Sequence, residues 1–171
     1  DDIQYLESIS NALDIALSEA DLAQIKEELM QSGYIRRKHT KKKVKLTSKP
    51  MHYISSDGYH IYVGKNNLQN DQLTFHFAVG NDWWFHAKGA PGSHVIVKSG
   101  GDELPDRTFE EAGRLAAYYS KNRGADKVEI DYIQKKHVKK PNGAKPGFVV
   151  YYTNYSLVID SDISNIKNVQ D

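Results

Sequence analysis

The spacing of apolar residues changes near residue 48, and this change constrains the fold more than any other feature. Residues 3–17 carry apolar side chains three and four positions apart, as one face of a helix requires. A second such stripe begins after Ser18, a residue type that favours helix starts, and it ends at Gly33. From Met51 onward, short strand-like segments replace these stripes. The sequence therefore predicts a short helical hairpin followed by a domain rich in strands.

The segment from Met51 onward has the pattern of an α+β domain. Asp57-Gly58 separates two strand-like segments and predicts a tight hairpin. A helix is expected over 108–121, with Gly124 as its stop, and a short helix is allowed between 66 and 77. Strands are expected at 52–55, 59–63, 83–88, 93–98, 128–133, 148–152 and 156–159. We therefore expect a mostly antiparallel mixed sheet with one or two packed helices.

Composition divides the chain into four segments: an acidic helical hairpin at 1–35, a basic linker at 36–50, the main domain at 51–162 and a tail at 163–171. The hairpin cannot bury its apolar stripe alone, so the main domain or a preceding region must cover it. The apolar segments are far shorter than the roughly 20 residues that cross a bilayer, so no membrane insertion is expected. The oligomeric state stays open.

The net charge of +1 hides a strong segregation of charge. Of the 23 basic residues, 13 lie in two segments that contain none of the 22 acidic residues. Such sorting predicts a basic face for an anion-rich partner. The first segment holds Arg36, Arg37, Lys38, Lys41, Lys42, Lys43, Lys45 and Lys49, and the second holds Lys135, Lys136, Lys139, Lys140 and Lys145.

The second basic segment also contains two prolines and two glycines between residues 141 and 147, which indicate a shaped loop. Its lysines and exposed amides suit phosphate oxygens, although a solvated hairpin loop remains the alternative. Lys65, within Gly64–Asn67, is a third candidate phosphate contact at a helix start. The glycine spacing there does not match a nucleotide-binding P-loop.

Aromatic and basic side chains alternate in the segment 82–88. In a strand, Trp84, His86 and Lys88 share one face, which could stack on a base and contact phosphate, with His94 nearby. The alternative is that this face is simply exposed while Trp83 and Phe85 enter the core. These considerations give ten candidate nucleic-acid-binding residues: Lys65, Trp84, His86, Lys88, His94, Lys135, Lys136, Lys139, Lys140 and Lys145.

Evidence for a catalytic or metal centre is weak. His86, His94 and Asp82 would be the ligands or catalytic groups of a hydrolase, but no spacing supports a third metal ligand. Ser93 and His94 are adjacent in a strand and point to opposite faces, which argues against a nucleophile–base pair. The absence of cysteine excludes disulfides and thiolate sites. We expect no catalytic residue, no metal and no cofactor.

Several blocks of this chain, in order, resemble the C-terminal RNA-binding domain of the NFACT family. The resemblance covers about residues 51–160, and the acidic helices resemble the end of the coiled-coil arm that precedes this domain. The matching blocks are Ser56–Asn67, Gln69–Asp71, Leu73-Thr74, Asp82–Lys88, Pro91–Val95, Ala116–Ser120, Val128–Tyr132 and Val138–Val149.

The resemblance implies part of a cytoplasmic, ribosome-associated quality-control factor of bacteria. Family members bind the obstructed large subunit and promote alanine tailing of the stalled chain, so large-subunit RNA and tRNA are the implied partners. Gram-positive members are also described as fibronectin- or fibrinogen-binding proteins that reach the cell surface without a signal peptide. An adhesin fragment is therefore the alternative function, and a hydrolase using Asp82, His86 and His94 is the least favoured one.

Overall fold

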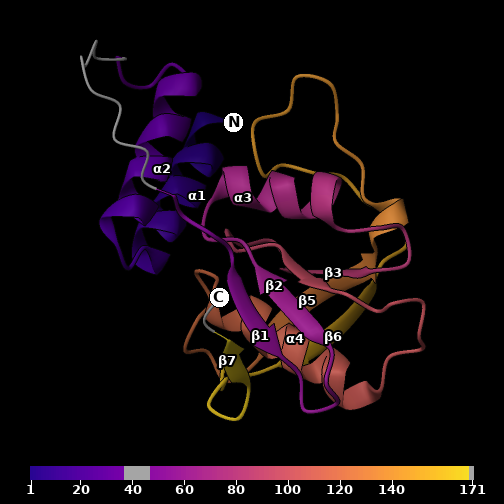
Figure 1. Ribbon diagram of the computed structural model, residues 1–171. Helices are drawn as coiled ribbons and strands as arrows, with labels where there is room; N and C mark the ends of the chain where they lie inside the picture. Colours follow the sequence, from indigo (N-terminus) through magenta and orange to yellow (C-terminus); the bar gives the residue numbers. More distant parts are fainter. Residues whose placement is uncertain (37–46, 170–171) are drawn as a thin grey trace.

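The chain forms a helical hairpin followed by a sheet domain, as Figure 1 shows for the computed structural model, which describes residues 1–36 and 47–169. Helix α1 spans Asp2–Ile15 and α2 spans Glu19–Gln31. The Ser18 hydroxyl accepts a hydrogen bond from the Asp21 amide and caps α2, as predicted. Most of the predicted basic linker, residues 37–46, lies outside the described residues.

The described residues contain one seven-stranded sheet in the order β6-β5-β3-β4-β2-β1-β7, and every neighbouring pair is antiparallel. The predicted α+β class is therefore confirmed. The strands are β1 Met51–Ile54, β2 His60–Val63, β3 Trp83–Ala87, β4 Val95–Val97, β5 Val128–Gln134, β6 Tyr155–Ile159 and β7 Lys167–Val169. Gly58, with φ of 89°, turns the predicted hairpin between β1 and β2.

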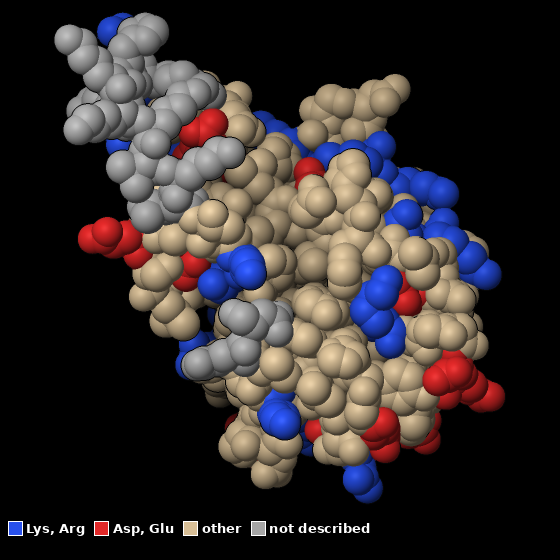
Figure 2. All heavy atoms as spheres, in the orientation of Figure 1, with Lys and Arg blue, Asp and Glu red and all other residues tan. Residues whose placement is uncertain are grey.

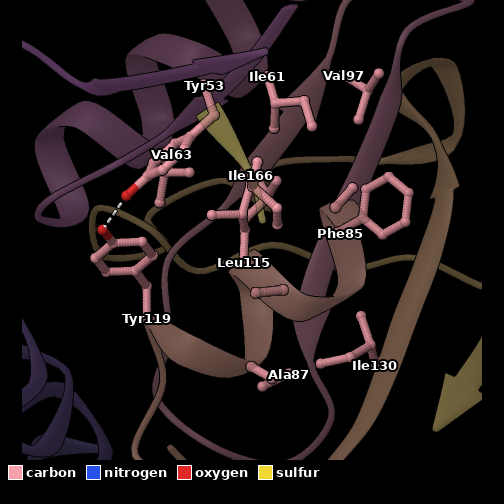
Figure 3. Packing of buried hydrophobic residues seen from close by; sticks show 14 of the residues in the cluster. Tyr53, Ile61, Val63, Phe85, Ala87, Val97, Leu115, Tyr119, Ile130 and Ile166 are labelled. Carbon is pink, nitrogen blue, oxygen red and sulfur yellow. Dashed lines mark hydrogen bonds between the residues drawn. The ribbon is translucent and has the colours of Figure 1, made fainter. Parts of the chain in front are cut away.

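Helices cover both faces of the sheet. Helix α4, Asp106–Tyr118, packs on one face, where Leu115 meets a core that includes Phe85 (Figure 3). Helix α3, Asn67–Gln72, continues into a π-helical turn at Leu73–Phe77 and lies over the other face. Leu73 from this turn belongs to a second apolar cluster with Trp84 and Ile96. Because both faces are covered, the central strands are buried on two sides.

The hairpin packs against the main domain. Its buried side chains Tyr5, Ile9, Ala12 and Ile25 form a third cluster, against which Phe148 packs. The Tyr5 hydroxyl donates to Glu28 at 2.6 Å, and the Asn67 amide at the start of α3 donates to the same carboxylate at 3.0 Å. The main domain therefore covers part of the hairpin stripe, as expected.

Three features differ from the sequence prediction. The expected strand at 148–152 is wrong, because this stretch forms only an isolated bridge between Lys139 and Val150. Both edges of β5 are already occupied by β3 and β6, so the apolar side chains of 148–152 pack onto neighbouring clusters instead. The tail at 163–171 contains an unpredicted strand, β7, which pairs with β1. Helix α4 ends at Tyr118, earlier than the stop expected from Gly124.

Candidate nucleic-acid interface

The loop between β5 and β6 is held in one shape by Lys140. Its ammonium group donates to the Asp71 carboxylate at 3.3 Å, to the Phe148 carbonyl at 3.0 Å and to the Lys145 carbonyl. The side chain is about three-quarters buried. Lys140, a predicted phosphate contact, therefore already satisfies its charge inside the protein.

Lys145 fastens the same loop to the helical hairpin. Its ammonium group pairs with Asp2 at 3.0 Å and donates to the Tyr34 hydroxyl at 2.9 Å. It also lies 4.5 Å from the centre of the Tyr5 ring, in cation–π geometry. These contacts explain why the pKa of Lys145 is raised, with the hydrogen bonds to Tyr34 and Asp2 as the main causes.

Three predicted lysines remain available to a partner. Lys136 and Lys139 are exposed and Lys135 is partly exposed, in and after a short 3-10 turn at Lys135–His137. Within residues 1–36 and 47–169, no carboxylate forms an ion pair with any of them. The backbone of the turn is fixed, because the amide of Lys135 donates to Asp82 and that of Lys136 to Gly80. The ammonium groups thus extend from a rigid base.

Exposed aromatic rings lie beside Lys139, because Tyr152 and Tyr155 line the same hollow as this lysine. Tyr152 is 77% exposed and Tyr155 is 58% exposed. Tyr155 stacks on Tyr132 with ring centres 5.5 Å apart, and the partly exposed Trp83 lies 6.0 Å from it. Thr153, between the two exposed tyrosines, has φ of 56°, a strained value for a β-branched residue that neighbouring structure must hold.

These side chains line a shallow groove at the end of the sheet where β5 ends and β3 begins. We call this surface the aromatic–basic groove. Its hollow is lined by Trp83, His137, Lys139, Tyr152, Thr153 and Tyr155, and the groove as defined also includes Lys135 and Lys136 of the adjoining 3-10 turn. Figure 2 shows Lys and Arg side chains gathered along the edge of the domain where the 3-10 turn lies in Figure 1. Cations beside exposed rings can contact phosphates while the rings stack on bases.

The predicted residues Trp84, His86 and His94 come together in a separate pocket on the other side of the loop. Trp84 and His86 have parallel rings 5.6 Å apart, and His94 meets the Trp84 ring edge-on at 5.2 Å. Trp84 is only 1% exposed, because the α3 side of the sheet is covered, whereas His86 is partly exposed. Of the three, His86 is therefore the one most open to a ligand.

His94 holds the loop rather than facing solvent. Its Nδ1 lies 2.8 Å from the Thr74 hydroxyl, and its Nε2 lies 2.9 Å from the Gly147 carbonyl, to which a protonated Nε2 donates. Burial lowers the pKa of His94 to about 3, and the neighbouring His86 adds to this effect. Burial also lowers the pKa of His86, so both imidazoles are neutral at pH 7.

The two remaining predicted residues lie apart from the groove. The Lys65 ammonium pairs with Asp21 of α2 at 3.1 Å and is mostly buried. Lys88 is exposed and pairs with Glu129 at 3.1 Å, and this contact is the main cause of its raised pKa. Lys65 thus joins the hairpin to the main domain, and Lys88 belongs to a mixed-charge surface.

Neither metal binding nor membrane spanning receives support from the described part of the chain. No group of three or more His, Asp or Glu side chains is placed there to hold a metal. Asp82 instead accepts hydrogen bonds from the Val79 and Ser99 amides and from Lys98 at 2.6 Å. Among the helices described, none is long and apolar enough to cross a bilayer.

The exposed tyrosines of the groove are not among the contacts predicted from the sequence. Tyr152 falls in an expected strand and Tyr155 just before another, so the sequence pattern predicts neither as a contact. The signal that could have found them is the density of tyrosines after the basic segment, at 151, 152 and 155. Aromatic residues close to lysines are typical of surfaces that bind single-stranded nucleic acid.

Comparison with known families identifies this domain. The family model described as the NFACT protein RNA binding domain matches residues 49–153, most of the sheet domain. The chain therefore belongs to the NFACT RNA-binding domain family, which confirms the resemblance found in the sequence.

Two curated relatives align with almost the whole chain. "Rqc2 homolog RqcH" of Streptococcus suis (strain 05ZYH33) is 43% identical over 169 residues, which is 98% of this chain and 30% of that protein. "Rqc2 homolog RqcH" of Bacillus subtilis (strain 168) is 40% identical over 171 residues, covering 97% of this chain and 29% of that protein. The chain thus spans about 30% of the length of these relatives.

A solved structure shares the fold. It is the C-terminal part of the fibronectin/fibrinogen-binding protein from Streptococcus suis, which superposes with a TM-score of 0.88 at 42% identity. The match covers 97% of this chain and 67% of that one. The helical hairpin is therefore part of the shared structure, as well as the sheet domain.

Proposed function

We propose that this chain binds RNA through the aromatic–basic groove. Lys135, Lys136 and Lys139 contact phosphates, while Tyr152 and Tyr155 stack on unpaired bases. The observation that carries this proposal is that Lys139, which has no carboxylate partner in the described part of the chain, lines one hollow with two largely exposed rings, and that Lys135 and Lys136 lie in the turn next to it. Exposed rings and unpaired cations on one rigid edge are the elements that single-stranded RNA recognition uses.

In this proposal the other predicted lysines shape the interface. Lys140 and Lys145 hold the loop by their contacts with Asp71 and Asp2, and His94 holds it through Gly147. A loop fixed before binding loses less conformational freedom in the complex, which favours affinity. The chain supplies binding and orientation, and no catalytic step.

We further propose that the chain serves a bacterial ribosome quality-control factor. The support is its identity of 40–43% with two proteins called Rqc2 homolog RqcH, over nearly all of its own length. The RNA partners in this proposal are large-subunit rRNA and tRNA, and the site of action is the ribosome in the cytoplasm. There the domain anchors the factor while stalled chains receive C-terminal alanine.

The test is RNA binding across a salt series. A fluorescent 12-nucleotide RNA is titrated with wild type and with the Lys135→Ala/Lys136→Ala/Lys139→Ala variant, from 50 to 200 mM salt. For single strands, log K falls with log salt with a slope of about −0.7 per phosphate contact. We therefore expect the slope of the triple variant to be less steep than that of wild type by about 2.

The control removes the same charge elsewhere. Lys88, Lys127 and Lys167 are exposed and lie outside the groove, so their triple alanine variant changes net charge equally. We expect its slope to stay within about 0.5 of wild type, because long-range effects of distant charges are screened. Equal losses in both variants would mean that net charge, and not the groove, drives binding.

A second candidate function is binding to fibronectin or fibrinogen. It is favoured by the similarity to a solved structure from a protein named as fibronectin/fibrinogen-binding. Immobilised fibronectin and fibrinogen are tested beside the RNA with the same variants. Saturable binding that survives 500 mM salt, together with no RNA binding, would make the adhesin function the leading one.

A further inference from the structure

The pocket lined by Trp84, His86 and His94 has a size and walls that suit a small flat ligand. It has a volume of about 300 Å3, at the lower end of the range for small-molecule sites. Its walls come from α1, from the β3–β4 turn at Gly89–Gly92 and from the loop at Gly147–Val149. Three distant parts of the chain thus enclose one hollow.

The polar groups of this pocket do not match a phosphate. Among the described residues its lining includes no Lys or Arg, and the one carboxylate, Glu7, stands at the rim on α1. His86 contributes a neutral imidazole, since burial lowers its pKa. A phosphate bound here would lie near the Glu7 carboxylate with no cation to balance the two negative charges. An uncharged ring with N–H groups carries no such penalty.

A preformed aromatic stack lies at the base of the pocket. The His86 ring is parallel to the buried Trp84 ring within 12°, and His94 closes the stack edge-on at 5.8 Å from His86. His86 and Trp84 both line the pocket, and of the two only His86 is partly exposed, so His86 is the member of the stack that a ligand can reach. An incoming flat ring can extend this stack without rearranging the core.

The pocket also adjoins the aromatic–basic groove. Tyr151 lines the pocket, and its neighbour Tyr152 lines the groove, so one segment of the loop separates the two. The Tyr151 hydroxyl donates to Asp131 at 2.6 Å, which fixes this wall. A nucleic-acid strand crossing the loop at this point can reach both sites.

We propose that this pocket takes a single unstacked nucleobase of the bound RNA, which lies against His86 while the strand continues into the groove. This inference rests on the proposed RNA-binding function and adds to it a specific base site. RNA-binding domains commonly accept bases that are splayed out of the strand and stacked on aromatic or His side chains.

The first test uses single nucleotides, which do not depend on the groove. AMP, CMP, GMP and UMP are titrated into 15N- and 13C-labelled protein, and the NMR signals of the His86 ring, Gly92 and Tyr151 are followed. We expect saturable shifts with at least one nucleotide and none with ribose 5-phosphate, which lacks a base. Shifts at these residues with ribose 5-phosphate, or no shifts with any of the four nucleotides, would overturn the proposal.

The second test fills the pocket from its rim. Gln4 is exposed on α1 and lines the pocket, so Gln4→Trp obstructs it without disturbing the core. Ile3→Trp is the matched control, because Ile3 is 70% exposed on the same turn and does not line the pocket. Thermal unfolding of both variants confirms that they fold as wild type does.

The result separates the base site from the groove. We expect Gln4→Trp to bind the 12-nucleotide RNA about tenfold more weakly with an unchanged salt slope, since one stacked base but no phosphate contact is lost. Ile3→Trp should bind as wild type. If Gln4→Trp also binds as wild type while the groove lysine variant is impaired, the base site is wrong and the groove stands. If Gln4→Trp alone is impaired, the groove is wrong and the base site stands.

Discussion

Replacing Gly147 with alanine should destabilise the protein strongly, because this residue combines a left-handed backbone with a close contact. Its φ is 83°, a region in which an alanine costs about 1–2 kcal/mol. An added Cβ would also stand 2.3 Å from the Asn67 Oδ1 atom, so Asn67 would have to move. Asn67 donates to Ser8 at 2.9 Å and to Glu28 at 3.0 Å.

The expected magnitude follows from these contacts. Losing two hydrogen bonds costs about 1–3 kcal/mol in total, which with the backbone cost of about 1–2 kcal/mol gives about 2–5 kcal/mol for Gly147→Ala. Gly143→Ala, in the same loop, is the control: its φ is 76°, but no atom lies within 4 Å of the added Cβ. It should lose only the backbone part, about 1–2 kcal/mol.

The assay is urea unfolding followed by circular dichroism, with the free energy of unfolding compared at equal m-values. We expect Gly147→Ala to lose about 2 kcal/mol more than Gly143→Ala, because only Gly147→Ala disturbs Asn67. Equal losses in the two variants would refute the reasoning that the loop is pinned to α3 at this residue.

Two further predictions concern the groups that hold the loop. Lys140→Met should reduce the free energy of unfolding by about 1–3 kcal/mol, since Asp71 and two carbonyls lose their donor, while Lys139→Met should stay within about 0.5 kcal/mol of wild type in the same urea assay. The lowered pKa of His94 means that the unfolded chain binds more protons than the native one between pH 6.5 and about 3, so stability should fall as the pH drops through this window. The His94→Gln variant should be less stable than wild type at pH 7, but its free energy of unfolding should fall less on acidification, as urea curves at several pH values would measure. A fall as steep as that of wild type would assign the pH dependence to other groups such as His86.

Elements with local signals could be predicted from the sequence. The Asp57-Gly58 turn, the Ser18 cap and the apolar stripe of α4 act over a few residues, and each produced the expected element. The apolar run at 148–152 could not be assigned in this way. Its conformation depends on which strand edges are free, and β5 has none after pairing with β3 and β6.

The same limit applies to the candidate site. Lys140 and Lys139 are adjacent and equivalent in sequence, yet only Lys140 is bound to a carboxylate in the described structure. The acidic partners of Lys140 and Lys145 lie 69 and 143 residues away in the chain, so no local pattern reveals them. Sequence reasoning thus located the basic loop correctly but could not distinguish the lysines that hold it from those that remain available.

The most direct test of the groove as the RNA interface is to map the contact on the protein. A 15N-labelled sample is titrated with the 12-nucleotide RNA, and the backbone amide shifts are followed residue by residue. The account predicts the largest changes at Lys135–Lys139 and at Tyr152–Tyr155, around the aromatic–basic groove. Changes concentrated instead around Lys88 or on β7, with the groove unperturbed, would contradict it.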